Sequence, residues 1–158
     1  MGRLTHPELL EPGDQVRSTA SVEYSRPARG GSWSSSLIWG RNHSTASARN
    51  TNAYLAETVL PIHRKNFITG RFEQVDKDDL FEDQPELMNF LDRTYGSTFR
   101  VREYTIGYTR DFDWFRSIES GVGANFSLYG IPGAIQPYYG SRPAGGNVFV
   151  RFRLKPRV

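Results

Sequence analysis

Apolar and polar residues alternate along much of this chain, most regularly near its C-terminal end. In the segment 147–155 the even positions are apolar and the later odd positions are basic: Val148, Val150, Phe152 and Leu154 against Arg151, Arg153 and Lys155. Successive side chains of a β-strand point to opposite faces. The pattern therefore predicts a strand with one apolar face and one charged face.

The same alternation recurs six more times. It predicts strands over residues 15–25, 32–41, 52–62, 66–74, 99–110, 118–129 and 147–155. Strands of about 9–11 residues are typical of membrane-spanning β-structure, whereas strands of soluble proteins average about 5–6 residues. We therefore expect an all-β fold, an antiparallel up-and-down meander of about seven long strands.

The connections between the predicted strands alternate between short and long. Residues 26–31, 64–65 and 111–116 form the short ones, and residues 42–51, 75–98 and 130–146 the long ones. The segment 75–98 also contains a predicted helical turn around Leu87, Phe90 and Leu91. Outer-membrane barrels have short periplasmic turns and longer extracellular loops, so the rhythm favours part or most of a transmembrane β-barrel.

The domain organisation follows from these strands. We expect an irregular lead-in over residues 1–14 and one β-barrel domain over residues 15–158. The opening residues lack the continuous apolar core of a signal peptide, and seven strands are fewer than the eight of the smallest bacterial barrels. The sequence thus predicts the C-terminal part of a larger barrel, or else one further strand inside the lead-in.

Composition narrows the function classes. The hydrophobic content is 37%, yet the chain has 10 Phe, 8 Tyr and 3 Trp, a combination that suits strands with one polar face. The chain has no cysteine, which excludes disulfides and thiolate metal sites. The net charge of +3 is carried by scattered residues rather than by a basic patch, so we expect no nucleic-acid partner.

The polar positions of the predicted strands carry charges of both signs. A charge on the lipid face near the midplane costs about 2–4 kcal/mol for Arg or Lys, so these residues are expected to line a polar interior and to pair there as arginine–carboxylate bridges. For a soluble sandwich they would simply form the solvated face. The predicted lumen residues are Arg17, Glu23, Glu57, Arg71, Glu73, Glu103, Glu119, Arg151 and Arg153.

Aromatic residues gather near the ends of the predicted strands. Amphipathic rings favour the headgroup zone of a membrane, although aromatic residues are also common in strands of soluble proteins. The predicted membrane-interface residues are Tyr24, Trp33, Trp39, Tyr54, Tyr108, Trp114 and Tyr129.

Two chemical readings compete with the barrel prediction. His43 and Ser44, with Glu57 further along, suit a lipid-modifying barrel enzyme, but sequence neighbours do not define a triad. The acidic segment 73–83 offers oxygen ligands for a divalent cation, yet it lacks the glycine of an EF-hand loop, and a solvated outer loop explains it better. We therefore predict no catalytic residues, no metal and no cofactor.

Several segments carry a resemblance to a known group of proteins. They are SLIWGRNH (36–43), NAYLAE (52–57), FITGRFE (67–73) with DLF (79–81), IGYTRD (106–111), FSLYGIP (126–132) and PYYGS (137–141). With them the chain resembles, over residues 15–155, the C-terminal half of uncharacterised bacterial outer-membrane β-barrel proteins. The resemblance implies fold and location without a substrate. Such barrels usually end on an aromatic residue, whereas this chain continues past Phe152.

The expected function is that of an outer-membrane β-barrel protein or fragment with a structural or passive, porin-like role. The expected partners are outer-membrane lipid, the barrel-assembly machinery, and the remaining strands of the barrel or a second copy. A first alternative is a soluble β-barrel that binds an apolar ligand inside, and a second is the lipid-modifying enzyme. The faces discriminate, because a ligand-binding barrel turns its apolar residues inward and a membrane barrel turns them outward.

Overall fold

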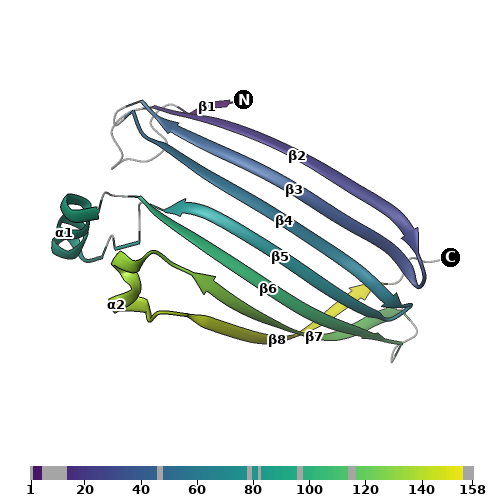
Figure 1. The fold of residues 1–158 in the computed structure, drawn as a ribbon. Helices are drawn as coiled ribbons and strands as arrows, with labels where there is room; N and C mark the ends of the chain where they lie inside the picture. Colours follow the sequence, from purple (N-terminus) through teal and green to yellow (C-terminus); the bar gives the residue numbers. More distant parts are fainter. Residues whose placement is uncertain are drawn as a thin grey trace.

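The protein is built around one antiparallel sheet in which eight strands follow one another in chain order (Figure 1). The computed structural model describes residues 2–4, 14–45, 48–77, 80–81, 83–95, 98–113 and 117–154. Each strand pairs with the next one along the chain, as in an up-and-down meander. The predicted all-β antiparallel meander is confirmed.

All seven predicted strands are present, and each is longer than the alternating pattern alone indicated. Backbone pairing continues beyond the alternation; Pro27, for example, pairs with Ser32 although it lies in a predicted turn. Proline is accommodated there because, among the described residues, that part of the strand has no hydrogen-bonded neighbour on its other side. The strands are β2 (Gln15–Ala28), β3 (Gly31–Ser44), β4 (Asn50–His63), β5 (Asn66–Lys77), β6 (Phe99–Phe112), β7 (Ile118–Gly130) and β8 (Ala144–Leu154).

The lead-in was predicted to be irregular, and this was wrong at one point. Strand β1 (Gly2–Leu4) pairs with the first three residues of β2, in the register Gly2 to Arg17 and Leu4 to Gln15. Three residues are too few to display a two-residue period, so the sequence pattern carried no signal for them. This strand is short, and it does not decide between the C-terminal part of a larger barrel and an eighth long strand in the lead-in.

Among the described residues, three helical segments interrupt the meander. Helix α1 (Pro85–Tyr95) confirms the predicted helical turn. The 3-10 helix η1 (Gly133–Ile135) and the helix α2 (Gln136–Tyr139) lie in the Gly- and Pro-rich connection, where no helix was predicted. Elements of three and four residues are shorter than the window in which a helical period becomes visible.

The two ends of the sheet differ. The long connections, with α1 and α2, gather at one end, and the short turns at the other (Figure 1). The β2–β3 and β4–β5 turns at the second end contain only residues 29–30 and 64–65. The alternation of short and long connections is therefore also a separation in space, and we call the two ends the loop end and the turn end.

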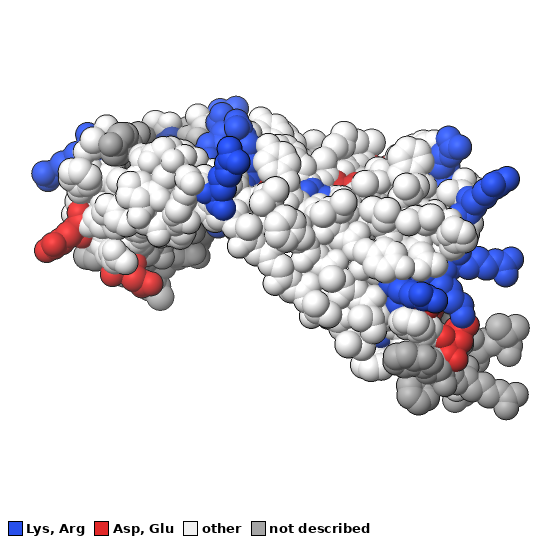
Figure 2. Space-filling model, turned by 60° about the horizontal axis from the view of Figure 1, so that its bottom comes forward, with Lys and Arg blue, Asp and Glu red and all other residues white. Residues whose placement is uncertain are grey.

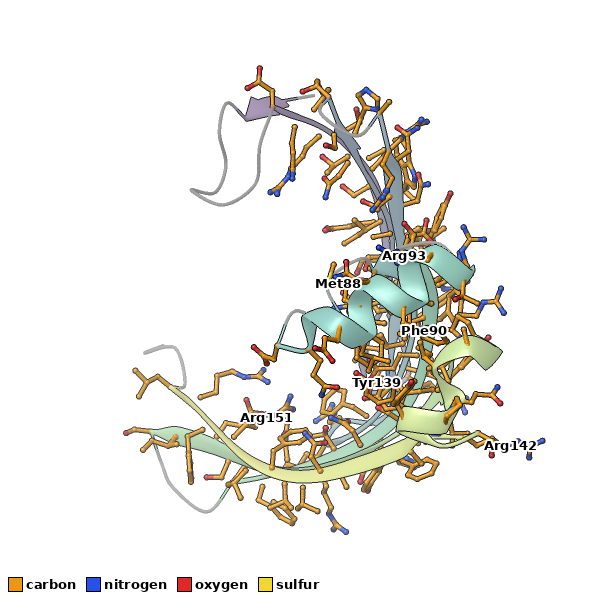
Figure 3. All side chains as sticks on the ribbon, turned by 90° about the vertical axis from the view of Figure 1, so that its left-hand side faces the viewer. Met88, Phe90, Arg93, Tyr139, Arg142 and Arg151 are labelled. Carbon is orange, nitrogen blue, oxygen red and sulfur yellow. The ribbon has the colours of Figure 1, made fainter. Side chains whose placement is uncertain are left out.

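The sheet is strongly curved, so that in the view along the strands it forms an open arc (Figure 3). Arg151 of β8 lies on the concave side of this arc (Figure 3). Side chains alternate along a strand, so Val150 and Phe152 lie on the convex side. In the described residues β8 pairs only with β7, and the arc is not closed by pairing between its first and last strands.

The buried apolar core lies outside the body of the sheet. Among the described residues the buried apolar side chains are Phe81, Leu91, Phe99 and Ile135. They join α1, η1, the connection before α1 and the first residue of β6 at the loop end. Neither broad face of the sheet is covered by a second layer of the described chain.

Candidate functional site

The convex face of the sheet is an exposed apolar surface. Register pairing places one set of alternating residues from every long strand on it. Ile106, for instance, is 62% exposed and Val148 is 76% exposed. Soluble monomers rarely expose such a continuous apolar surface. Its large members are Val22, Tyr24, Leu37, Tyr54, Leu60, Ile68, Tyr104, Ile106, Tyr108, Val122, Phe126, Leu128, Val148, Val150, Phe152 and Leu154.

Arginines bound this apolar surface at both ends. On β6 the convex face carries Arg102, then Tyr104, Ile106 and Tyr108, then Arg110. Figure 2 shows a wide, largely uncharged region between two groups of charged residues in which Lys and Arg are prominent, with a few charged atoms at its upper edge. The spacing from Arg102 to Arg110 is eight residues, which is about 26 Å along an extended strand.

A shallow hollow of about 1070 Å³ lies within the convex surface. Large side chains, among them Trp33, Leu60 and Phe126, surround the smaller Thr58 and Gly70. The polar groups in it are bonded to one another: the indole N–H of Trp33 donates to Thr58 Oγ1 at 2.8 Å, and Thr58 Oγ1 donates to the carbonyl of Ser34 at 3.2 Å. Because these polar groups are hydrogen-bonded within the protein, the hollow suits an apolar group better than water.

Five of the predicted interface aromatics share the convex face, near its two borders. Trp39 and Tyr54 are cross-strand partners at the loop end. At the turn end the rings of Tyr24 and Trp33 meet edge to face with centroids 5.5 Å apart, and Tyr108 donates to Asn66 at 2.6 Å.

Two predicted interface residues do not join this set. Tyr129 lies on the concave face, where its hydroxyl donates to Glu103 Oε1 at 3.3 Å, because its odd position in β7 aligns it with Glu103. Trp114 lies outside the described residues. Tyr129 was predicted to lie at the membrane interface because it is near a strand end. Its odd position in β7 instead puts it on the concave, polar face.

All nine predicted lumen residues project from the concave face. The register carries the polar set from strand to strand, for example from Ser36 to Glu57, Arg71 and Thr105. The face is not wholly polar, since Ile38, Leu55 and Val59 share it. In the sequence, Ile38 stands between the apolar residues Leu37 and Trp39 and so breaks the alternation of its strand.

Hydrogen bonds tie the polar groups of the concave face together. Glu103 Oε1 accepts from Thr105 at 3.0 Å and from Ser127 at 2.9 Å. Arg71 donates to Glu73 at 2.6 Å, and Ser36 donates to Glu57 at 3.1 Å. Charges of both signs are thereby held on the concave face. Here Arg71 pairs with Glu73 of its own strand, and Glu57 and Glu103 accept from hydroxyl groups rather than from arginines.

The deepest ion pair on this face was not predicted. Arg151 of β8 donates to Asp111 of β6, with Nη2 2.6 Å from Oδ1 and 2.8 Å from Oδ2. The Asp111 side chain is only 3% exposed, and the guanidinium of Arg151 also lies over the ring of Phe67. The alternation in the sequence puts the odd positions of β6 and β8 on one face. Only the register shows that Asp111 and Arg151 lie at the same level of that face.

The residues of the two chemical readings are not brought together. His43 lies in β3, and its Nδ1 is 2.9 Å from Asn50 Oδ1. Its odd position in β3 puts it on the convex face, whereas Glu57 lies on the concave one. Within the part of the chain that is described, no group of three or more acidic or histidine side chains is arranged to hold a metal ion, and Asp76 of the acidic segment pairs with Arg100.

Two further observations bear on the site. Within the described residues no helix has the length and apolarity needed to cross a membrane. In comparisons with known proteins, no family model, no curated protein and no solved structure matches this chain. The geometry of the two faces therefore carries the functional proposal.

Proposed function

We propose that this chain forms the wall of a bacterial outer-membrane β-barrel with a structural or passive transport role. In this proposal the convex face contacts lipid and the concave face lines a polar, charged lumen. The loop end faces the outside of the cell and the turn end the periplasm, as in barrels of this kind. The protein would work together with outer-membrane lipid, the barrel-assembly machinery and further strands that close the arc.

The observation that carries the proposal is that the exposed apolar face is the convex one. A soluble barrel that holds an apolar ligand needs its apolar residues on the inside of the curve. Here the inside of the curve carries Glu57, Arg71 and Glu103, and the outside carries Ile106 and Val150. Lipid supplies the apolar contact that this convex surface lacks within the described chain.

The dimensions of the apolar belt support the same reading. Arg102 and Arg110 lie about 26 Å apart along the strand. If the strand is tilted by about 40° from the membrane normal, this distance spans about 20 Å of membrane depth. Long arginine side chains reach outward and add to this depth. The sum approaches the apolar band of about 25 Å in outer-membrane barrels.

The test compares two substitutions of similar chemistry on opposite faces. Ile106→Arg places a charge on the convex face, halfway between Arg102 and Arg110. Val59→Arg places the same charge on the concave face, at another β-branched residue that is exposed. The full chain is unfolded in urea, diluted into phosphatidylcholine vesicles, and scored for insertion by protection from protease.

Lipid contact on the convex face predicts that Ile106→Arg lowers the insertion equilibrium by about 2–4 kcal/mol, the cost of Arg near the midplane. Val59→Arg is then expected to insert within about 0.5 kcal/mol of the unchanged chain. Equal effects of the two substitutions, or a monodisperse monomer without detergent or lipid, would contradict the proposal. The second outcome would favour the soluble barrel.

A further inference from the structure

We propose that the loop end of the convex face carries a binding rim for the phosphate groups of anionic lipids. The rim consists of Arg41, Arg100 and Arg102, with Asn50 and Gln74 as their cross-strand partners, and we call it the arginine rim. This inference rests on the proposed function, because it names the lipid class that the convex face selects.

The arginine rim occupies two adjacent rows of the sheet, with Arg41 and Arg100 in the outer row. Arg41 pairs with Asn52 in the register, the backbone N–H of Asn52 donates to Asp76, and Asp76 pairs with Arg100. The next row inward contains Trp39, Tyr54 and Arg102. The rim therefore borders the aromatic residues that end the apolar belt, at the depth where lipid headgroups begin.

Two guanidinium groups of the rim, those of Arg41 and Arg102, are each held in place through one nitrogen. Arg41 Nε donates to Asn50 Oδ1 at 3.2 Å, and Arg102 Nε donates to Gln74 Oε1 at 2.9 Å. These bonds to neutral amides orient the guanidinium without cancelling its charge, and they leave its two terminal nitrogens outside the contact. A guanidinium fixed in this way presents paired donors that match the oxygens of a phosphate.

The third arginine plays a different part. Arg100 Nε lies 2.8 Å from Asp76 Oδ1, so its charge is compensated locally. Asp76 also accepts from the backbone N–H of Asn52 at 3.1 Å. The uncompensated charge is therefore carried by Arg41 on β3 and Arg102 on β6. Three strand spacings of about 4.8 Å separate these strands, so the two guanidiniums serve separate phosphate groups.

The opposite border of the belt is built differently. At the turn end, Arg26 lies 6.0 Å from the ring centre of Trp33, and Arg110 lies 5.4 Å from that of Phe112. Guanidiniums that rest on aromatic faces are engaged by the ring. Positive charge therefore occurs at both borders, but Arg41 and Arg102 of the arginine rim are bonded to amide oxygens, whereas Arg26 and Arg110 lie against aromatic rings. This contrast assigns the phosphate groups to the loop end.

The experiment measures the lipid preference of the full chain. Binding is compared between phosphatidylcholine vesicles and vesicles containing phosphatidylglycerol with the same acyl chains, at constant ionic strength. The double variant Arg41→Gln/Arg102→Gln tests the rim, and Arg26→Gln/Arg110→Gln is the matched control with the same loss of charge. The unchanged chain is expected to prefer phosphatidylglycerol, and the rim variant to lose about 30-fold of that preference. The control variant is expected to keep most of it.

The outcomes separate the inference from the proposed function. Association with neither vesicle would overturn the proposed function. Association with both vesicles equally well would leave the proposed function standing and overturn the rim. A control variant that loses as much preference as the rim variant would show diffuse attraction and would also overturn it. Removal of the preference by excess inorganic phosphate would identify a free-phosphate site instead of a lipid site.

Discussion

Arg151 and Asp111 form an ion pair that spans three strands. The two residues belong to β8 and β6, and the residue between them in the register is Gly121 of β7. A Cβ atom at position 121 would lie 2.5 Å from Asp111 Oδ1 and 3.0 Å from Arg151 Nε. Gly121 of β7 therefore leaves room for the ion pair that joins β8 to β6.

We predict that Asp111→Ala destabilises the fold. The substitution removes a carboxylate that accepts three hydrogen-bond contacts from Arg151 and leaves that arginine, 35% exposed, without this partner. The expected loss is about 2 kcal/mol of unfolding free energy, measured by urea unfolding in detergent micelles. Glu119→Gln is the control, because its pair with Arg153 is long, at 3.7 Å, and more exposed. A control effect as large as that of Asp111→Ala would contradict the role given to burial.

A second prediction concerns the close approach of two turns at the turn end. Gly30 has a φ of +98°, and a Cβ there would lie 2.6 Å from the backbone carbon of His63. Gly30→Ala is therefore expected to cost about 2 kcal/mol or more, from the left-handed backbone and the contact together. The same urea titration measures it. Gly133→Ala is the comparison, since no atom lies within 4 Å of the added Cβ, and it should change stability by less than about 1 kcal/mol.

A third prediction separates the small core from the sheet. Leu91 is 1% exposed and packs with Ile135 and Phe99, whereas Phe90 on the same helix is 58% exposed. Leu91→Ala should therefore weaken the docking of α1 by about 2–3 kcal/mol, which speeds exchange of the α1 amides by roughly 30-fold or more. Phe90→Ala should leave that exchange nearly unchanged. If the strand amides lose as much protection as α1 does, the core at the loop end is not a separate unit.

A fourth prediction tests the barrel in cells. The chain is expressed with a signal peptide attached, the cells are fractionated, and the outer-membrane fraction is run on a gel with and without heating. Closure of the arc by a second copy of the chain gives a barrel that resists detergent until it is heated, so a heat-dependent band shift in that fraction is expected. A soluble periplasmic product without a shift would contradict the membrane barrel and favour a soluble barrel that binds an apolar ligand.

Alternation along the chain was enough to predict the strands and their faces. The segment 99–110 places Glu103 and Tyr104 on opposite sides, and the structure keeps them there because a strand has a period of two. The same reasoning found α1 from Leu87, Phe90 and Leu91. It did not find β1, η1 or α2, which are too short to show a period.

Relations across strands were beyond the reach of the pattern. Alternation within β7 places Tyr129 on the polar face with Glu119 and Ser127, but only the register shows that it faces Glu103 there. The pairing of Asp111 with Arg151 likewise depends on which residues face one another across β7. A one-residue change of register would have moved every such residue to the other face, so these contacts follow from pairing and not from composition.

The sequence by itself determined that each strand has an apolar and a polar face, because side-chain alternation is a local property of the extended backbone. It did not determine which face lies on the outside of the curve. That depends on the cumulative twist and bending of the whole sheet, which place Arg151 on the concave side (Figure 3) and Val150 and Phe152 on the convex side. Curvature is a property of all strands together, and only the tertiary structure could decide it.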